Sequence, residues 1–287
     1  MSLPPRPERL DVRPDLVRRL VAEQFPQWAH LPVDPVDRPG WDNRTFRLGP
    51  AMTVRMPSAA GYAEAVAKEQ RWLPVLAPQL PLPVPVPLGH GVPDRDYPFP
   101  WSVYGWLDGR TAFEEAPADP VRFAADVARF LVALGRVDPA GGPQPGQHNW
   151  FRGGPLTTYD AQTRQALRDL AGRVDVAAAR SVWEEALAAS WDGVDRWFHG
   201  DVAPGNLLLS GGELSAVIDF GTCGVGDPSC DLAIAWTTFT GAARETFRAE
   251  LGVDDATWAR GRGWALWKAL ITIDESEHVV EEILRTR

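Results

Sequence analysis

The stretch HGDVAPGN, residues 199–206, places an aspartate and an asparagine on either side of a proline and a glycine. Such a segment is too polar and too interrupted for a buried strand or helix, so we expect a loop. Eighteen residues after Asp201, the apolar run from Leu214 to Ile218 leads directly into Asp219. Phosphoryl transfer from a nucleotide needs one carboxylate to orient the attacking hydroxyl, and a carboxylate with an amide oxygen to hold magnesium. Asp201, Asn206 and Asp219 supply all three groups.

The spacing of these residues matches the catalytic loop and metal site of protein kinases. In isolation, Asp201 and Asn206 could equally form an Asx turn and a helix cap. Asp219 favours the catalytic interpretation, because an acid at the end of a buried strand is costly unless it has a cation.

The elements before about residue 105 predict a small lobe built on a sheet. A helical stripe within residues 13–25 is followed by short β-type runs that flank a turn at Gly49 and Pro50. Residues 63–76 return to helical spacing, and extended segments follow around residues 99–107.

Beyond residue 105 the pattern is mainly helical. The most regular helix begins with Asp119 as its cap and Pro120 at its first position, and stops at Gly135. Further helical patterns occupy about residues 160–190 and 256–284. We therefore expect two unequal lobes, a small sheet-based lobe followed by a mainly helical one.

Composition narrows the classes of partner. The chain has 287 residues, is 45% hydrophobic and carries a formal net charge of −9. This acidity argues against nucleic-acid binding, which needs a basic face. We find no apolar run of transmembrane length and no signal segment, so we expect no membrane partner and a cytoplasmic location. Cys223 and Cys230 are too few for a disulfide framework and lack the histidines of a zinc site.

Three segments, HGDVAPGNLLL, SAVIDFG and GVGDPSCDLAIAW, together resemble the aminoglycoside phosphotransferase family, which are small-molecule kinases with a protein-kinase-like fold. The resemblance implies that Asp201 is the catalytic aspartate and that Asn206 and Asp219 bind Mg²⁺. It gives His199 a bracing role in the loop. Asp227 and Asp231 match family acids that hold the catalytic loop from below.

The resemblance implies an α+β bilobal fold like that of protein kinases, with an antiparallel-sheet lobe over residues 1–104 that binds nucleotide and a helical lobe over residues 105–287 that carries the catalytic loop and the substrate site. It also extends to motifs of the first lobe. GWDNRTFRL stands where the family has its phosphate-covering loop, and FPWSVYGWLDG resembles its hinge. The family's phosphate-binding lysine is here Arg55, which is permanently charged and able to bind two phosphate oxygens. Its expected helix partner is Glu69, with Glu64 as the second choice. The other residues expected at the ATP or GTP are Asn43, Arg44 and Thr45, which could instead form only a tight turn, and Ser102, Val103 and Tyr104 through their backbones.

The resemblance leaves several acceptors open. An aminoglycoside, and with it a role in antibiotic resistance, comes first; a macrolide, an amino alcohol or a sugar is the alternative, because VRMP also resembles macrolide kinases. A protein substrate is disfavoured by the short segment after Asp219. Arginine in place of lysine leaves open a nucleotide-binding sensor without catalysis.

Acidic clusters predict a cationic acceptor, since they attract it by their field; solvated helix faces are the alternative interpretation. The glycine-rich stretch 139–155 is too long for a simple connector and offers further contacts. The candidate substrate contacts are Glu114, Glu115, His148, Asn149, Trp150, Arg152, Asp274 and Glu275. We expect a monomer or a dimer.

Overall fold

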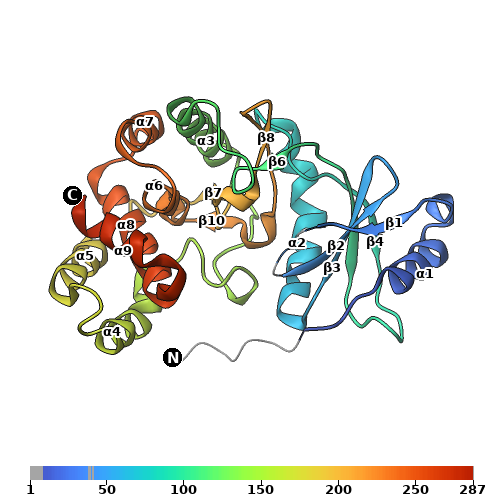
Figure 1. The fold of residues 1–287 in the computed structure, drawn as a ribbon, viewed down its shortest axis with the longest axis horizontal. Coiled ribbons are helices and arrows are strands. Elements are labelled where there is room, and N and C mark those ends of the chain that lie inside the picture. The colour runs from blue at the N-terminus through green and yellow to red at the C-terminus, as the bar shows by residue number, and fades with distance from the viewer. Residues whose placement is uncertain (1–8, 38–39, 41, 287) are drawn as a thin grey trace. The chain divides into compact units, whose positions relative to one another are not determined.

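The computed structural model describes residues 9–37, 40 and 42–286. The chain forms two compact units (Figure 1). The sheet unit comprises the described residues up to Asp108 together with Val217–Gly221. The helical unit comprises Gly109–Ala216 and the described chain from Thr222 onward. The segment that carries Asp219 therefore belongs to the sheet unit, although it lies far along the chain.

The sheet unit is built on five antiparallel strands in the order β1-β2-β3-β5-β4. The strands are β1 (Val33–Pro35), β2 (Asn43–Leu48), β3 (Met52–Pro57), β4 (Pro87–Gly91) and β5 (Trp101–Gly105). The hairpin expected around Gly49 is present, because β2 and β3 pair from Asn43 with Pro57 to Leu48 with Met52. Gly49 has a φ of 58°, which a residue without a side chain adopts at little cost.

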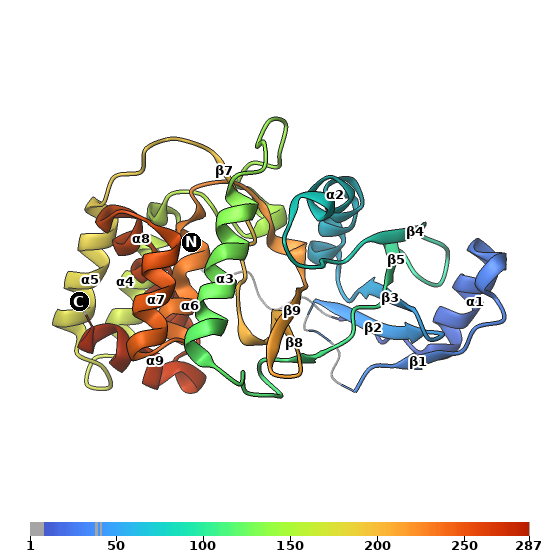
Figure 2. The same cartoon turned by 90° about the horizontal axis from the view of Figure 1, so that it is seen from above.

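Two helices cover this sheet. Helix α1 (Pro14–Gln24) buries Val17, Leu20 and Val21 of the predicted stripe, and the remaining residue of that stripe, Leu16, is partly buried against the same core. Helix α2 (Ala60–Leu76) packs against β3, β4 and β5 and carries Glu69 to the sheet. Figure 2 shows α2 along one face of the sheet. The core includes Phe46, Leu48, Val54, Met56, Tyr97, Trp101 and Val103.

The helical unit holds two short sheets that frame the HGDVAPGN loop. Strands β6 (Arg110–Thr111), β8 (Leu207–Ser210) and β9 (Glu213–Val217) lie in the order β6-β8-β9. Strand β7 (Arg196–Phe198) pairs antiparallel with β10 (Gly224–Gly226). Because β7 ends at Phe198 and β8 begins at Leu207, the loop joins one small sheet to the other.

Helices make up the rest of this unit. They are α3 (Pro120–Gly135), α4 (Asp160–Asp169), α5 (Val176–Ala188), α6 (Ile234–Thr237), α7 (Gly241–Leu251), α8 (Asp255–Ile271) and α9 (Ile273–Arg285, with non-helical dihedrals at Ser276). The predicted cap of α3 is confirmed, since Asp119 accepts hydrogen bonds from the backbone of Val121 and Arg122. Helix α3 packs against α7, and α8 packs against α5 and α9 (Figure 2). Within the described residues, no helix combines the length and apolar character needed to cross a bilayer.

Candidate active site

The loop between β7 and β8 depends on a glycine at its second position. Gly200 has a φ of 88°, and a Cβ there would lie 2.6 Å from the carbonyl oxygen of Thr222. Both the dihedral and the lack of space exclude a larger residue. The loop ends in a single 3₁₀ turn, Pro204–Asn206, which leads directly into β8.

A buried carboxylate holds this loop. Asp231, in the 3₁₀ segment Pro228–Ala233, accepts hydrogen bonds from the backbone nitrogens of His199 at 2.7 Å and Gly200 at 2.6 Å. Burial raises the pKa of Asp231, and the two amide donors only partly offset that rise. The start of the HGDVAPGN loop is therefore fixed by two hydrogen bonds to one side chain.

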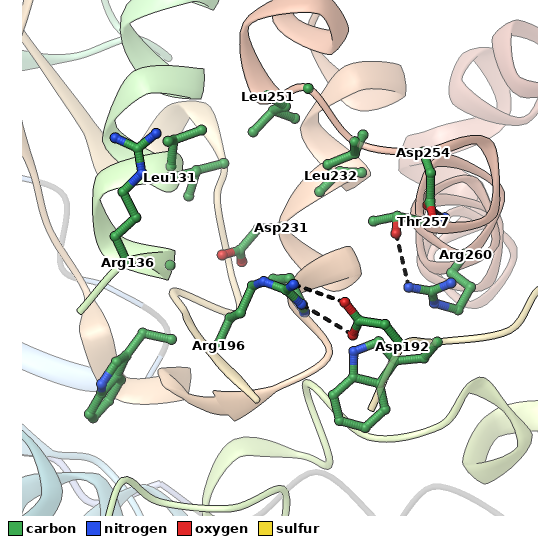
Figure 3. Close-up of a pocket in the computed structure, with 17 residues that line it drawn as sticks. Leu131, Arg136, Asp192, Arg196, Asp231, Leu232, Leu251, Asp254, Thr257 and Arg260 are labelled. Carbon is green, nitrogen blue, oxygen red and sulfur yellow. Dashed lines mark hydrogen bonds and ion pairs between the residues drawn. The ribbon is translucent and has the colours of Figure 1, made fainter. Parts of the chain in front are cut away.

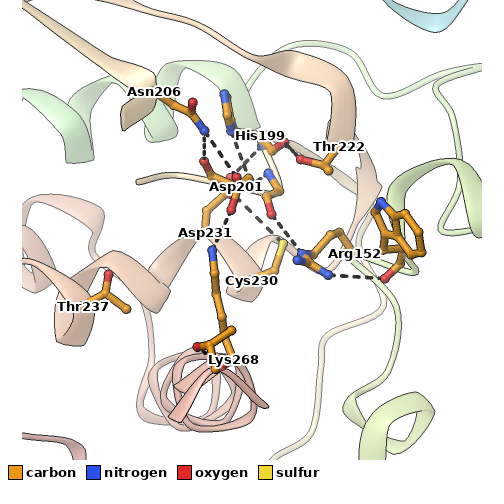
Figure 4. A network of polar contacts seen from close by, with 12 residues as sticks. Arg152, His199, Asp201, Asn206, Thr222, Cys230, Asp231, Thr237 and Lys268 are labelled. Carbon is orange, nitrogen blue, oxygen red and sulfur yellow. Dashed lines mark hydrogen bonds and ion pairs between the residues drawn. The ribbon is translucent and has the colours of Figure 1, made fainter. Parts of the chain in front are cut away.

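Asp201 lies at the centre of a polar network (Figure 4). Its Oδ1 accepts a hydrogen bond from Nζ of Lys268 at 2.7 Å, and its backbone nitrogen donates to Nδ1 of His199 at 3.2 Å. Nδ2 of Asn206 donates to the backbone oxygen of Asp201 at 2.8 Å and to Oδ2 at 3.4 Å. Burial alone would raise the pKa of Asp201, but the charge and hydrogen bond of Lys268 outweigh it and hold the pKa below its ordinary value. Asp201 is thus ionised at neutral pH.

A second cation lies near Asp201. Nε of Arg152 donates to the backbone oxygen of Gly200 at 3.0 Å, and its guanidinium lies 5.1 Å from the ring centroid of Trp267. Its positive charge also helps to lower the pKa of Asp201. Trp267 is fixed in turn, because its Nε1 donates to Gln162 at 2.8 Å.

A second group of polar residues, in the sheet unit, surrounds Asp219. Its φ is 67°, an unusual conformation for a residue other than glycine. Nη2 of Arg55 contacts Oδ1 of Asp219 at 2.6 Å, and Nη1 lies 3.4 Å from Oε1 of Glu69. Tyr104 donates to the other oxygen of Glu69 at 2.6 Å. Burial alone would lower the pKa of Arg55, but the charges of Asp219 and Glu69 raise it overall.

The residues expected to bind Mg²⁺ have suitable chemistry within each unit. Nδ2 of Asn206 is taken up by Asp201, which leaves Oδ1 as an oxygen that accepts no hydrogen bond from the described residues. Asp219 is 36% exposed, and only its Oδ1 is bonded by a described side chain. Amide and carboxylate oxygens are the ligands that Mg²⁺ prefers, and it usually completes its shell with water and phosphate. No group of three or more His, Cys, Asp or Glu suited to a metal occurs among the described residues.

The other residues predicted to bind the nucleotide lie in strands β2 and β5. Asn43, Arg44 and Thr45 do not form a tight turn, because they lie in β2 and pair with β3. The backbone of Ser102, Val103 and Tyr104 was expected to contact a purine, but β5 pairs with β3 on one side and β4 on the other. Ser102, Val103 and Tyr104 thus lie inside the sheet, and their backbone contact with a purine stays a prediction.

Several residues that were predicted to contact the substrate bind other residues of the chain. The side chain of Asn149 is fully buried, and its Oδ1 and Nδ2 bind the backbones of Gly146 and Arg152, so the expected substrate contact is wrong. His148 contacts the backbone of Gln144, and the backbone oxygen of Trp150 accepts a hydrogen bond from Tyr159. Among the predicted acids, Glu114 accepts a hydrogen bond from the backbone nitrogen of Thr111. Asp274 forms an ion pair with Arg173 at 2.7 Å. Glu115 is partly exposed and Glu275 is exposed.

Asp227 acts on the HGDVAPGN loop through the segment that carries Asp231. It accepts from the backbone nitrogen of Ser229 at 3.1 Å and pairs with Arg260 of α8 at 2.7 Å. Its role is to cap the 3₁₀ segment that carries Asp231 and to join that segment to α8.

Sequence reasoning missed Lys268. One signal was available: only Lys68 and Lys268 are lysines among the 29 lysines and arginines. Both contact polar groups, since Lys68 donates to the backbone oxygen of Gly221 at 2.7 Å.

A cavity of the helical unit is lined by residues that do not include Asp201. It has a volume of about 430 Å³ (Figure 3). It lies among α3, the start of α8 and the ion pair of Asp192 with Arg196, which are 2.8 Å apart. Asp231 lines it, but Asp201 and Asn206 do not. The cavity therefore does not hold the groups that carry the chemistry.

Comparison with known proteins decides the family. The model of a family described as "Phosphotransferase enzyme family" matches residues 36–264. The chain belongs to this family. The prediction of a phosphotransferase is therefore confirmed. No curated protein matches the chain.

Solved structures show that this phosphotransferase has the fold of antibiotic kinases. The GDP complex of aminoglycoside 2'-phosphotransferase-IIIa is 18% identical, with a TM-score of 0.72 over 96% of this chain and 98% of that one. Macrolide 2'-phosphotransferase MphH from Brachybacterium faecium is 21% identical, with a TM-score of 0.60 over 95% and 99%. The ADP-bound aminoglycoside phosphotransferase APH(2'')-Ib is 15% identical, with a TM-score of 0.60 over 96% and 98%. The predicted α+β kinase-like fold is confirmed.

Proposed function

We propose that this phosphotransferase moves the γ-phosphoryl group of ATP or GTP to a hydroxyl of a small molecule. The observation that carries the proposal is Asp201, an ionised and partly exposed carboxylate on a loop fixed by Asp231 and Asn206. The hydroxyl oxygen attacks the γ-phosphorus, the bond to the β-phosphate oxygen breaks, and ADP or GDP leaves. Asp201 orients the hydroxyl and accepts its proton late, because the transition state is loose and needs little base strength.

Asn206 and Asp219 are the proposed ligands of the Mg²⁺ that accompanies the nucleotide. Bound there, the ion would offset the charge that develops on the leaving diphosphate. Arg55 would contact the phosphates, and its position beside Asp219 supports this role. Relatives with the same fold are described as GDP and ADP complexes, which supports a nucleotide donor without choosing between ATP and GTP.

The relatives do not select one acceptor. One aminoglycoside kinase of this fold is described in a complex with GDP and kanamycin, whereas others are macrolide kinases of similar identity. We keep the aminoglycoside predicted from the sequence as one acceptor to be tested, beside macrolides, amino alcohols and sugars. A role in resistance would follow only from turnover of an antibiotic.

The test is magnesium-dependent release of ADP and GDP across such a panel, with Asp201→Asn as the inactive variant. Loss of a positioned acid or base costs about 10²- to 10⁴-fold in rate, and nucleotide binding should persist. Asp169→Asn, an exposed acid of α4, is the matched control. Undiminished turnover by Asp201→Asn would refute the assigned role. Nucleotide binding with no turnover of any acceptor would favour the sensor.

A further inference from the structure

The charged side chains around Asp201 bear on the choice of acceptor, an inference that rests on the proposed function. Lys268 projects from α8, and its Nζ lies 2.7 Å from Oδ1 of Asp201. Neither side chain is sealed from solvent, since Lys268 is 42% and Asp201 35% exposed. A ligand that reaches Asp201 therefore meets an ammonium group beside the carboxylate.

A second positive charge strengthens this environment. The guanidinium of Arg152 is fixed by its bond to Gly200 and lies 5.1 Å from the ring centroid of Trp267, the residue that precedes Lys268 in α8. The neighbouring acid, Asp231, is buried and both of its oxygens accept backbone hydrogen bonds, so a ligand cannot pair with it directly. Two cations thus face one accessible carboxylate.

Asp274, one of the acids expected to attract a cationic acceptor, is paired with an arginine, and so are two other acids of α9. Arg173 binds Asp274 at 2.7 Å and Glu277 at 3.3 Å. Glu282 binds Arg244 and Arg285, both at 2.5 Å. These pairs reduce the negative field of α9, in which Glu275 and Glu281 remain exposed.

We propose that Lys268 is a specificity-determining residue that disfavours polycationic acceptors and favours an acceptor whose hydroxyl lies next to a carboxylate or phosphate. The anionic group would pair with Lys268 and Arg152, while the hydroxyl meets Asp201. Ammonium and guanidinium groups form strong, charge-assisted hydrogen bonds with such anions. A polycation would have to compete with Lys268 for Asp201.

Calorimetric titration with two probes tests this. Kanamycin is the polycationic probe and D-gluconate, a polyhydroxy carboxylate, is the anionic one. In Lys268→Met and Lys268→Gln we expect kanamycin affinity to rise about tenfold and gluconate affinity to fall about tenfold. Lys268→Arg, which keeps the charge, should keep the native preference. Arg180→Met, an exposed cation of α5, is the matched control and should change neither.

Opposite shifts for the two probes support the proposal, because a merely structural role for Lys268 would weaken both. Parallel shifts, unchanged affinities, or gluconate binding that is equal or undetectable in both the native protein and the variants would overturn it. Thermal unfolding of each variant checks that it is folded. If the neutral variants do not fold, loss of the native preference in a folded Lys268→Arg variant would still overturn the proposal.

The binding test is independent of turnover. Opposite shifts without turnover of any acceptor would uphold the charge preference and count against the kinase. Turnover that is lost in Asp201→Asn, together with unshifted affinities, would do the reverse.

Discussion

At the scale of single residues, the HGDVAPGN loop, which we propose is catalytic, depends on a glycine that has no reactive group of its own. Gly200 lets the backbone take a φ of 88°, and a Cβ at this position would lie 2.6 Å from the carbonyl oxygen of Thr222. This conformation presents two successive amides to Asp231. The placement of Asp201 therefore depends on a glycine as much as on its charged neighbours.

We expect Gly200→Ala to destabilise the protein by at least about 1–2 kcal/mol, the cost of the left-handed conformation for a residue with a Cβ. The displaced loop should lower turnover by about 10²-fold, since misplacement by about 1 Å has such an effect. Chemical denaturation and initial rates measure the two effects.

Gly205→Ala, in the same loop, is the matched control. Its Cβ would have no atom within 4 Å and its φ is not positive, so its stability should change by no more than about 0.5 kcal/mol. Equal losses in the two variants would contradict the role assigned to Gly200.

At the scale of elements, the helical unit is joined by ion pairs and hydrogen bonds at helix ends. Asp160, the first residue of α4, accepts a hydrogen bond from Nε1 of the buried Trp183 of α5 at 2.8 Å and pairs with Arg164 at 2.8 Å. Burial alone would raise the pKa of Asp160, but these partners outweigh it and hold the pKa below its ordinary value of 3.8.

The lowered pKa of Asp160 makes the stability of the fold depend on pH. Because the pKa is lower in the folded than in the unfolded protein, ionised Asp160 stabilises the fold above about pH 4, and this contribution is lost as the pH falls through the folded-state pKa. We expect Asp160→Asn to lower the free energy of unfolding by about 1 kcal/mol at pH 7 and by much less at pH 3. Urea denaturation at both values measures this.

Asp169→Asn, at the exposed end of the same helix, should show a smaller effect at pH 7. A difference between the native protein and Asp160→Asn that grew towards acid pH would contradict the assigned direction of the pKa.

At the scale of the whole molecule, the proposed ligands of one metal belong to different units. Asn206 lies in the helical unit, whereas Asp219 lies in a segment that belongs to the sheet unit. A nucleotide with Mg²⁺ that binds only the folded protein must stabilise it, by about 2.7 kcal/mol at 100 times its dissociation constant.

We therefore expect ADP with Mg²⁺ to raise the melting temperature more than ADP alone, and Asp219→Asn to lose most of this extra rise. Asparagine tolerates the positive φ of Asp219, so the backbone should be kept while the charge is removed. Scanning calorimetry measures the shifts. Asp34→Asn, an exposed acid of β1, should behave as the native protein does. An undiminished magnesium effect in Asp219→Asn would remove it from the metal site.

The sequence by itself determined the family, the fold class and most of the elements. Helical stripes, the turn at Gly49 and the cap at Asp119 are encoded in residues close along the chain, because local periodicity and turn chemistry act over a few positions. The three motifs with their fixed spacing likewise placed Asp201 and Asn206 on one loop.

Only the tertiary structure decided which charges meet. Lys268 and Asp201 are 67 positions apart, and Arg55 and Asp219 are 164 apart. No periodicity links such positions, since their contact depends on how α8 packs beneath the loop and how β3 lies against the segment of Asp219. The double pairing of β5, which takes up the backbone of Ser102–Tyr104, is likewise non-local. Strand order is set by the packing of the whole sheet, whereas the strand itself is set by its own residues.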